Sequence, residues 1–418
     1  MIFPRTNYLQ ELIDGQRHDM IKIVTGIRRC GKSYLLFTIF HQYLIEHGVD
    51  AKHIIELSLD DRNNAHLTQP DTLLKFIDAN DPKDDKICYV ILDEVQMVDD
   101  FVGVLLSLMH RRNTQVYVSG SNSKFLSSDV VTEFRGRGWE IRIHPLSFAE
   151  YFEGVGGDYR QALQNYFRYG GLPQVALLDS EQSKKQYLRT VYEATYLKDV
   201  IEHNNLRNAE GMEHLVQVLA SSIGSSTNPL RIANTFKTKE KLSITSRTIS
   251  EYLHYLQDAF IIDGALRYDV KGRKYIGTET KYFFEDIGIR NMLLNFRQQE
   301  DTHLMENVIY NELCLRGYSV DVGVVNIWEQ DKKKESKRKT LEVDFVVNNP
   351  PQRVYIQSVL ALPDREKTIQ EQRPLVNVPD HFRKIIILGN DYQASWTDDE
   401  GVQIITLHDF LLNKAPLW

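Results

Sequence analysis

The chain has 418 residues, of which 42% are hydrophobic and 26% charged, and its formal net charge is −7. This length exceeds a single ordinary core and indicates two or three domains. The longest apolar stretches, such as residues 88–92 and 385–388, suit buried strands and are too short to span a bilayer. The negative charge gives no general attraction to nucleic acid, so any DNA contact would need a local basic patch.

The N-terminus and the cysteines indicate the compartment. Residues 1–5 lack the charged-then-apolar layout of a secretory signal. The three cysteines, Cys30, Cys88 and Cys314, lie far apart and form no Cys-x-x-Cys pair, which argues against a disulfide framework or a zinc site. We therefore expect a cytoplasmic protein that makes no contact with a membrane.

The first 150 residues alternate short apolar strands with helical patterns, which is typical of a parallel α/β sheet. Helices are expected at 71–79 and 101–110. The expected strands are residues 21–25, 53–59, 87–93, 115–119 and 139–143.

The segment after the first expected strand reads Gly-Ile-Arg-Arg-Cys-Gly-Lys-Ser. A nucleoside triphosphate needs backbone N–H groups around its β-phosphate, a cation near its γ-phosphate and a hydroxyl on Mg²⁺. Gly26 lets the chain leave the strand sharply and Gly31 lets the backbone approach the phosphate, while Lys32 supplies the cation and Ser33 the metal ligand. The helix that follows faces the anion with its positive N-terminus. We expect ATP and Mg²⁺ to bind here, with the loop contributing Gly26, Ile27, Arg28, Arg29, Cys30, Gly31, Lys32, Ser33 and Tyr34.

A second motif is the buried apolar strand at 88–93, which ends in Asp93 and is followed by Glu94. In isolation such an ending is often only a solvated strand edge. About 60 residues downstream of a phosphate-binding loop, it predicts that Asp93 holds Mg²⁺ and that Glu94 polarises the attacking water as general base. The pair of carboxylates favours hydrolysis.

The strand at 115–119 runs into a polar turn. In ATPases with an inserted central strand, a polar residue at the tip of that strand senses the γ-phosphate. Ser119, Ser121 and Asn122 are all candidates, and an ordinary polar turn is the alternative.

Four arginines have open roles. Arg135 and Arg137, just before the last expected strand, could stabilise charge on a transferring phosphoryl group in this chain or in a neighbouring subunit, or could be surface residues in a turn. Arg28 and Arg29 could pair with Asp60 or Asp61, or contact nucleotide directly.

These motifs resemble those of a bacterial and archaeal family of AAA-superfamily ATPases with a C-terminal domain of unknown function. The resemblance rests on residues 26–33, 92–96, 119–121, 136–137 and 145–148 in the first half and on 252–256, 284–288, 306–307 and 342–345 in the second, so it covers nearly the whole chain. It implies ATP binding and hydrolysis, a central winged helix-turn-helix, and a terminal domain similar to restriction-endonuclease-like folds.

The middle of the chain is mostly helical and contains helix-turn-helix spacing at 230–236 and 246–260. Thr245 or Ser246 would cap the second helix, with Ile249, Tyr252, Leu253 and Leu256 on its inner face. Its outer face would carry Arg247, Ser250, Glu251 and His254, which is poor in groups that read DNA. DNA contact and a scaffold or protein-partner role both remain open.

In the terminal region, strands are expected at 343–347, 354–358, 384–388 and 403–406. A restriction-type nuclease needs a helical Glu, a strand carboxylate and a Glu-x-Lys strand to hold a metal. Glu306 and Asp344 suit the first two places, but Gln357 and Val359 stand where the second carboxylate and the lysine belong. We expect a retained fold without nuclease activity.

A basic run at 332–339 is expected in a hairpin loop, where it could contact phosphates or simply be solvated.

The expected organisation is a P-loop ATPase domain at 1–150, a helical lid or linker at 151–210, a winged-helix-like domain at 211–295 and a restriction-endonuclease-like domain at 296–418. The expected function is ATP hydrolysis coupled to conformational change on a nucleic-acid or protein partner, in a protein that could form a homo-oligomer. The alternatives are a slow nucleotide-dependent switch that binds a protein partner and an ATP-dependent nuclease.

Overall fold

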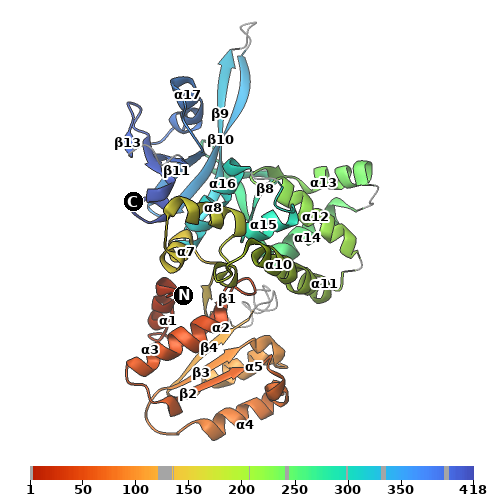
Figure 1. Ribbon diagram of the computed structural model, residues 1–418, viewed down its shortest axis with the longest axis vertical. Helices are drawn as coiled ribbons and strands as arrows, with labels where there is room; N and C mark the ends of the chain where they lie inside the picture. Colours follow the sequence, from red (N-terminus) through yellow and green to blue (C-terminus); the bar gives the residue numbers. More distant parts are fainter. Residues whose placement is uncertain are drawn as a thin grey trace.

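The computed structural model describes residues 3–120, 134, 136–206, 208–240, 244–297, 300–330, 336–389 and 395–418. Its described helices and strands form two bodies, each built on one sheet, with a group of helices between them (Figure 1). No helix among these residues is long and apolar enough to cross a bilayer.

The N-terminal body is a five-stranded parallel sheet with strand order β2-β3-β4-β1-β5. Its strands β1 and β3 are buried along their whole length, as expected for a parallel sheet covered on both faces. The expected strands are confirmed, with ends that differ by at most one residue. The elements are α1 (Thr6–Gly15), β1 (Ile21–Thr25), α2 (Lys32–Tyr34), η1 (Leu35–Phe40), α3 (His41–Glu46), η2 (Ala51–His53), β2 (Ile54–Ser58), η3 (Arg62–Thr68), α4 (Pro70–Asn80), β3 (Cys88–Asp93), η4 (Val95–Met97), α5 (Phe101–Met109), β4 (Thr114–Ser119) and β5 (Gly138–Arg142).

The position of β4 matters for the site. β4 lies between β1, which leads into the loop at 26–31, and β3, which ends at Asp93. The inserted central strand is therefore confirmed. Because the strands are parallel, the C-terminal ends of β1, β3 and β4 meet at one edge of the sheet.

A helical segment follows the first sheet and packs against it. One core of buried side chains contains Ile27 and Cys30 from the loop together with Tyr196 and Val200 from this segment. The elements are α7 (Phe148–Val155), α8 (Tyr159–Tyr169), α9 (Pro173–Ala176), α10 (Glu181–Val191), η6 (Tyr192–Leu197) and α11 (Lys198–His203).

Helices and strands alternate in the next segment. The inner face of α14 carries Ile249, Tyr252, Leu253 and Leu256, all buried, and the Thr245 hydroxyl caps its first turn, as expected. The elements are α12 (Ala209–Ser221), β6 (Ser226–Thr227), α13 (Pro229–Thr235), η7 (Phe236–Glu240), α14 (Ser246–Asp258), β7 (Ile262–Asp269), β8 (Lys274–Phe284) and α15 (Ile287–Leu293).

The second sheet has nine strands in the order β13-β14-β12-β11-β10-β9-β7-β8-β6, so it joins β6–β8 to the strands of the terminal segment. Its longest strands, β9 and β10, form a hairpin that projects away from the rest of the molecule (Figure 1). The terminal elements are α16 (Asp301–Leu315), β9 (Ser319–Gln330), β10 (Ser336–Asn349), β11 (Gln352–Val359), α17 (Arg365–Val376), β12 (Arg383–Leu388), β13 (Trp396–Thr397), β14 (Gln403–Thr406) and α18 (Leu407–Leu411).

One expectation for the terminal segment was wrong: residues 336–339 of the basic run lie in β10 rather than in a loop. The strand β9 was not among the expected strands. Residues 332–335 lie outside the described part of the chain. A paired strand continues through Lys337, Arg338 and Lys339 because each has a partner directly opposite on β9; cross-strand pairing outweighs the low strand propensity of lysine.

Candidate functional site

The loop at 26–31 has the backbone geometry that the sequence requires. Gly26 has φ 134° and Gly31 has φ 106°, both in the region that favours glycine. A Cβ atom on Gly26 would lie 2.1 Å from the carbonyl oxygen of Ile143, so a larger residue could not be accommodated there. The loop then enters α2 at Lys32.

Lys32 is buried and lies across the loop. Its Nζ donates to the carbonyl oxygens of Gly26 and Ile27 at 2.9 and 3.3 Å. The ammonium is thus held at the mouth of the loop, beside its backbone. A charged group at this place can meet the outer phosphates of a nucleotide without a large movement of the chain.

Asp93, Glu94 and Ser119 form a compact group at the ends of β3 and β4. The Ser119 hydroxyl donates to Asp93 Oδ1 and accepts from the Glu94 backbone N–H at 3.2 Å. Burial raises the pKa of Asp93, while hydrogen bonds from Ser119 and Ser33 act in the opposite direction. Ser33 and Asp93, the two expected metal ligands, are therefore in direct contact. A hydroxyl and a carboxylate are oxygen ligands that suit Mg²⁺, which completes its shell with phosphate and water.

Glu94 is the first residue outside β3 and adopts a left-handed backbone conformation with φ 53°. The side chain of Gln96 donates a hydrogen bond to Glu94 Oε2. Gln96 was not among the candidates, although it closes the Leu92–Gln96 motif. Its position makes it a positioning group for the Glu94 carboxylate.

The helical segment that follows the first sheet reaches this loop through two contacts that sequence reasoning missed. The Tyr196 hydroxyl donates to the Arg28 carbonyl oxygen at 2.8 Å, and Arg28 Nε pairs with Asp199 Oδ2 at 2.9 Å. Tyr196 is in the π-helical segment η6, and such wide turns recur at functional sites. Burial raises the pKa of Asp199, Arg28 lowers it, and the nearby charge of Glu94 raises it.

The remaining candidates are dispersed. Asp60 accepts from Ser58, and Asp61 caps η3, so the ion pair that the structure gives Arg28 is with neither of the expected partners. Arg29 is exposed and has φ 67°. Tyr34 is 41% exposed on α2. Ser121, Asn122 and Arg135 lie outside the described residues.

Arg137 is exposed and lies directly before β5. Its carbonyl oxygen accepts from the N–H of Ile21, the first residue of β1. It is therefore at the N-terminal edge of the sheet, roughly 17 Å from the loop by the length of a five-residue strand. A contact of Arg137 with phosphates bound at its own loop does not fit this geometry.

Comparisons with known proteins place the chain in a family. A protein of Haemophilus influenzae is 31% identical over 413 residues, which is 98% of each chain, and one of Methanocaldococcus jannaschii is 25% identical over 416 residues, 95% of this chain and 87% of that one. Both are described only as uncharacterized. The model of an AAA domain family matches residues 18–152, and that of a domain of unknown function (DUF8612) matches residues 160–300. This chain belongs to the family of AAA-domain P-loop ATPases that carry this second domain.

Solved structures resemble this AAA-domain ATPase only in outline. The Walker-type ATPase of Pyrococcus abyssi is 15% identical and covers 70% of this chain and 96% of its own, with a TM-score of 0.48. The ORC1 protein of Aeropyrum pernix, solved in complex with DNA, is 12% identical and covers 71% and 93%, with a TM-score of 0.30.

In this AAA-domain ATPase a network of charges links the end of the first sheet to the DUF8612 domain. Glu285, at the end of β8, pairs with Arg142 at 3.0 Å and His144 at 2.5 Å. Burial would raise the pKa of Glu285, but the charges of His144 and Arg142 prevail and lower it to about 2. Next to it, Asp286 accepts backbone N–H groups from Gly171 and Ile289. The segments 170–173 and 284–288 thus meet beside the nucleotide-binding body.

The terminal domain places its carboxylates around a lysine from β8. Lys281 Nζ pairs with Glu306 at 2.5 Å and Glu342 at 3.0 Å, and these charges outweigh burial and raise its pKa. Burial and the charge of Glu306 raise the pKa of Asp344, whose Oδ2 accepts from the Ser358 N–H. Gln357 Oε1 accepts from the N–H of Asp344 at 3.4 Å. The carboxylates are thus neutralised by an ammonium, and the described residues contain no group of three or more His, Cys, Asp or Glu that could hold a metal.

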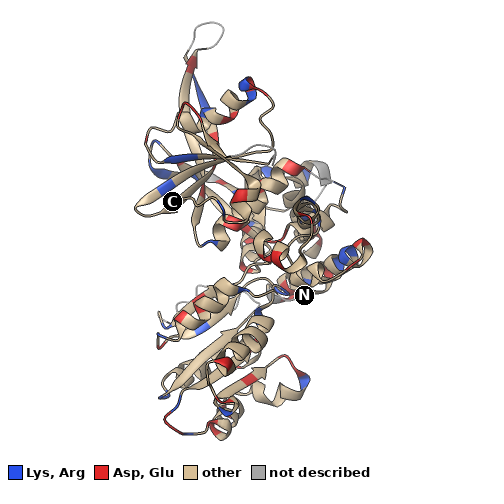
Figure 2. Cartoon of the chain, turned by 60° about the vertical axis from the view of Figure 1, so that its left-hand side comes forward, with Lys and Arg blue, Asp and Glu red and all other residues tan. Residues whose placement is uncertain are grey.

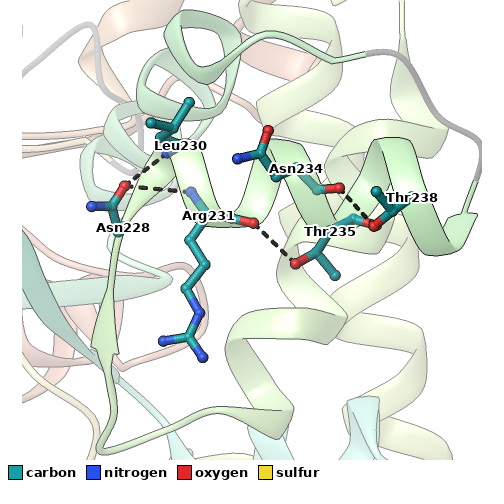
Figure 3. Close-up of a pocket in the computed structure, with 6 residues that line it drawn as sticks. All are labelled: Asn228, Leu230, Arg231, Asn234, Thr235 and Thr238. Atoms are coloured by element: carbon teal, nitrogen blue, oxygen red, sulfur yellow. Dashed lines mark hydrogen bonds between the residues drawn. The ribbon is translucent and has the colours of Figure 1, made fainter.

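Two surfaces of the DUF8612 domain lie away from the nucleotide-binding loop: the outer face of α14 and a hollow at α13. On the outer face of α14, Arg247 pairs with Glu251 and His254 with Asp258, so its charged groups face one another. A shallow hollow of about 330 Å³ is lined by residues of α13 and its two ends (Figure 3). Asn228 caps the helix, and the hydroxyls of Thr235 and Thr238 donate to main-chain carbonyls. These three polar groups therefore already have hydrogen-bond partners within the same segment.

Proposed function

We propose that this protein binds ATP with Mg²⁺ at residues 26–34 and hydrolyses it, with Glu94 as general base. The observation that carries the proposal is the contact of Ser33 and Ser119 with Asp93 directly beside Glu94. Through this contact the two metal ligands, Ser33 and Asp93, and the general base Glu94 lie together at one edge of the sheet. Mg²⁺, when bound, neutralises charge on the outer phosphates.

Each side chain then has a defined task. Lys32 stabilises negative charge on the outer phosphates, and Gly26 and Gly31 allow the loop to wrap the β-phosphate. Glu94 accepts a proton from the attacking water, and Gln96 orients its carboxylate. Ser119 is the γ-phosphate sensor that the described residues support best, because its hydroxyl joins Asp93 to the Glu94 backbone.

The arginine finger belongs to a neighbouring subunit under this proposal. Arg137 is exposed at the sheet edge opposite to the loop, where a second copy of the chain could bring its own site. An oligomer of this kind predicts that the specific activity rises with protein concentration. Mixing Arg137→Ala with Glu94→Gln should restore part of the activity that each variant lacks alone. In a mixed oligomer, the site between one Arg137→Ala subunit and one Glu94→Gln subunit has both Glu94 and Arg137. A mixture no more active than the separate variants would contradict an arginine finger from a neighbouring subunit.

The nucleotide state passes to the DUF8612 domain through Arg28. This one loop residue makes one contact with η6 and one with α11, so a shift of the loop must move these helices or break the contacts. The partner that receives this movement is a nucleic acid or a protein. We assign α12 to β8 as a winged helix and retain the four-part domain division, with the terminal domain as a catalytically silent restriction-endonuclease-like module.

A slow switch is the second candidate. It is favoured by the paired charges on α14, which leave that helix better suited to a protein contact than to base reading. A nuclease is disfavoured because Lys281 neutralises the carboxylates that would hold its metal.

The direct test is ATP hydrolysis by the purified chain, together with ATP binding. Lys32→Ala should abolish nucleotide binding or turnover, and Glu94→Gln should bind ATP with little hydrolysis. Glu46→Gln, on the exposed end of α3, is the matched control and should behave as the wild type. Undiminished turnover in Glu94→Gln would show that the base is misassigned, and very slow turnover in the wild type would favour the switch.

A further inference from the structure

A basic surface lies where the turn between β7 and β8 meets the β9–β10 hairpin. We define this turn–hairpin surface by five exposed side chains: Lys271, Arg273, Lys274, Trp328 and Arg338. Trp328 is 72% exposed, more than any other large hydrophobic side chain of the described residues. An indole left in water on a strand is an unusual feature, since burying an aromatic side chain is favourable.

Asn326 joins the two parts of this surface. Its carbonyl oxygen accepts from Lys271 Nζ at 2.9 Å, and its Oδ1 accepts from Arg338 Nε at 3.1 Å. β7 pairs in parallel with β9 just before this point, which fixes the turn beside the hairpin. The cations of the turn and of the hairpin are therefore neighbours although they are far apart in the sequence.

On the hairpin, Trp328 lies directly opposite Arg338 in the strand register. Side chains directly opposite in an antiparallel pair share one face and have Cβ atoms about 5 Å apart. The indole and the guanidinium are therefore neighbours on one face of the hairpin. The hairpin stands clear of the body, so this face can be approached by an extended ligand (Figures 1 and 2).

Carboxylates do little to neutralise the surface. Asp269 accepts the N–H groups of Lys271 and Gly272 and so shapes the turn. Glu329 is shared by Lys339 at 3.6 Å and by Arg373. The protein as a whole has a net charge of −7, so this surface is a local positive patch. Such a patch attracts a polyanion.

We propose that the turn–hairpin surface binds single-stranded nucleic acid, with one base stacked on Trp328 and the backbone phosphates held by Lys271, Arg338 and their basic neighbours. Single strands combine regularly spaced negative charges with bases whose flat faces are free to stack. The bases of an intact duplex are already stacked on one another, so a duplex can use the cations but not the indole. This assignment names the partner of the proposed ATPase. Only the role of the contact, to bring that partner to the ATPase, rests on the proposed function; the binding itself does not.

The test is binding of fluorescently labelled oligo(dT) and oligo(rU) of 20 nucleotides to the full chain without nucleotide, followed by anisotropy over a range of salt. Trp328→Ala should weaken binding by roughly fivefold or more, and Trp328→Phe should recover part of the loss. Lys271→Ala/Arg338→Ala should reduce the slope of log K against log salt by about 1.4, at about 0.7 for each phosphate contact. Either sugar fits the proposal, and the tighter oligomer identifies the strand.

Matched controls come from the same molecule. Trp396→Ala removes a 37% exposed tryptophan from β13, and Lys75→Ala/Arg112→Ala removes two exposed cations from the N-terminal body; both should bind as the wild type. Wild-type affinity in both turn–hairpin variants would overturn the proposal, as would a duplex bound as tightly as the single strand. ATP hydrolysis by the wild type, measured without oligonucleotide, separates the two proposals. A wild-type protein that binds the oligonucleotide but does not hydrolyse ATP would contradict only the ATPase proposal.

Discussion

Arg28 in the phosphate-binding loop pairs with Asp199 of the DUF8612 domain, with Nε and Oδ2 2.9 Å apart. The same loop residue accepts a hydrogen bond from the buried Tyr196 hydroxyl through its carbonyl oxygen. Ile27 and Cys30 on either side are buried in a core that also contains Tyr196 and Val200. The loop is therefore a part of the interface between the two domains.

Asp199→Asn should uncouple the DUF8612 domain from the nucleotide. Asparagine fits the space but cannot hold the charge of Arg28, so the ion pair that ties the loop to α11 is lost and only the Tyr196 hydrogen bond and the shared core remain. We expect ATP to protect residues 192–203 from hydrogen exchange in the wild type and much less in the variant. Glu202→Gln, an exposed change on the same helix, is the control. Full ATP-induced protection in Asp199→Asn would contradict the coupling.

Ser119→Ala should impair hydrolysis more than nucleotide binding. Its hydroxyl satisfies the buried Asp93 carboxylate and the Glu94 N–H, and leaving such groups unpaired costs about 1–3 kcal/mol. We expect turnover to fall about tenfold or more and the Mg²⁺ concentration for half-maximal activity to rise. Ser119→Thr keeps the hydroxyl and should recover activity, and Ser107→Ala on α5 should have no effect. An unchanged Mg²⁺ dependence would remove Ser119 from the site.

Glu285→Gln should destabilise the protein in a pH-dependent way. The pKa of Glu285 is lowered from 4.5 to about 2, so its ionised form stabilises the fold above pH 4.5 and this contribution is lost as the pH falls toward 2. The difference in the free energy of unfolding between wild type and variant should be about 3 kcal/mol at neutral pH, from about 1.4 kcal/mol per pKa unit, and shrink in acid. Denaturant unfolding from pH 7 to pH 3 measures it. A constant difference would show that the ion pairs with Arg142 and His144 contribute little.

Lys281→Met should destabilise the terminal domain by about 3 kcal/mol, because it removes the cation from a buried group of carboxylates. The loss should be smaller at acid pH, where those carboxylates can take up protons. Lys274→Met lies on the same strand at an exposed position and serves as the control. A variant as stable as the wild type at neutral pH would mean that the carboxylates find other partners. Metal-dependent cleavage gained in Lys281→Met would instead reveal a nuclease site that Lys281 occupies.

Local patterns predicted the first sheet well. Apolar runs over residues 21–25 and 88–93 become strands that are buried throughout, as a parallel sheet requires. The glycines at 26 and 31 were predictable because a loop that wraps an anion needs backbone conformations that other residues avoid. The strand β9 was not predicted, since its place in the sheet depends on pairing with β7 and β10, which are distant in the sequence.

By itself, the sequence determined the fold of the nucleotide-binding body and the residues of its two motifs, because each motif is a run of neighbours that fixes its own backbone. The tertiary structure alone decided which distant residues complete these sites. Nothing near Arg28 in the sequence indicates Asp199, and nothing near Asp344 indicates Lys281. Charges that are wholly or partly removed from water need a counter-charge, but any of many side chains can provide one. Only the packing of the two sheets and the helices between them selects it.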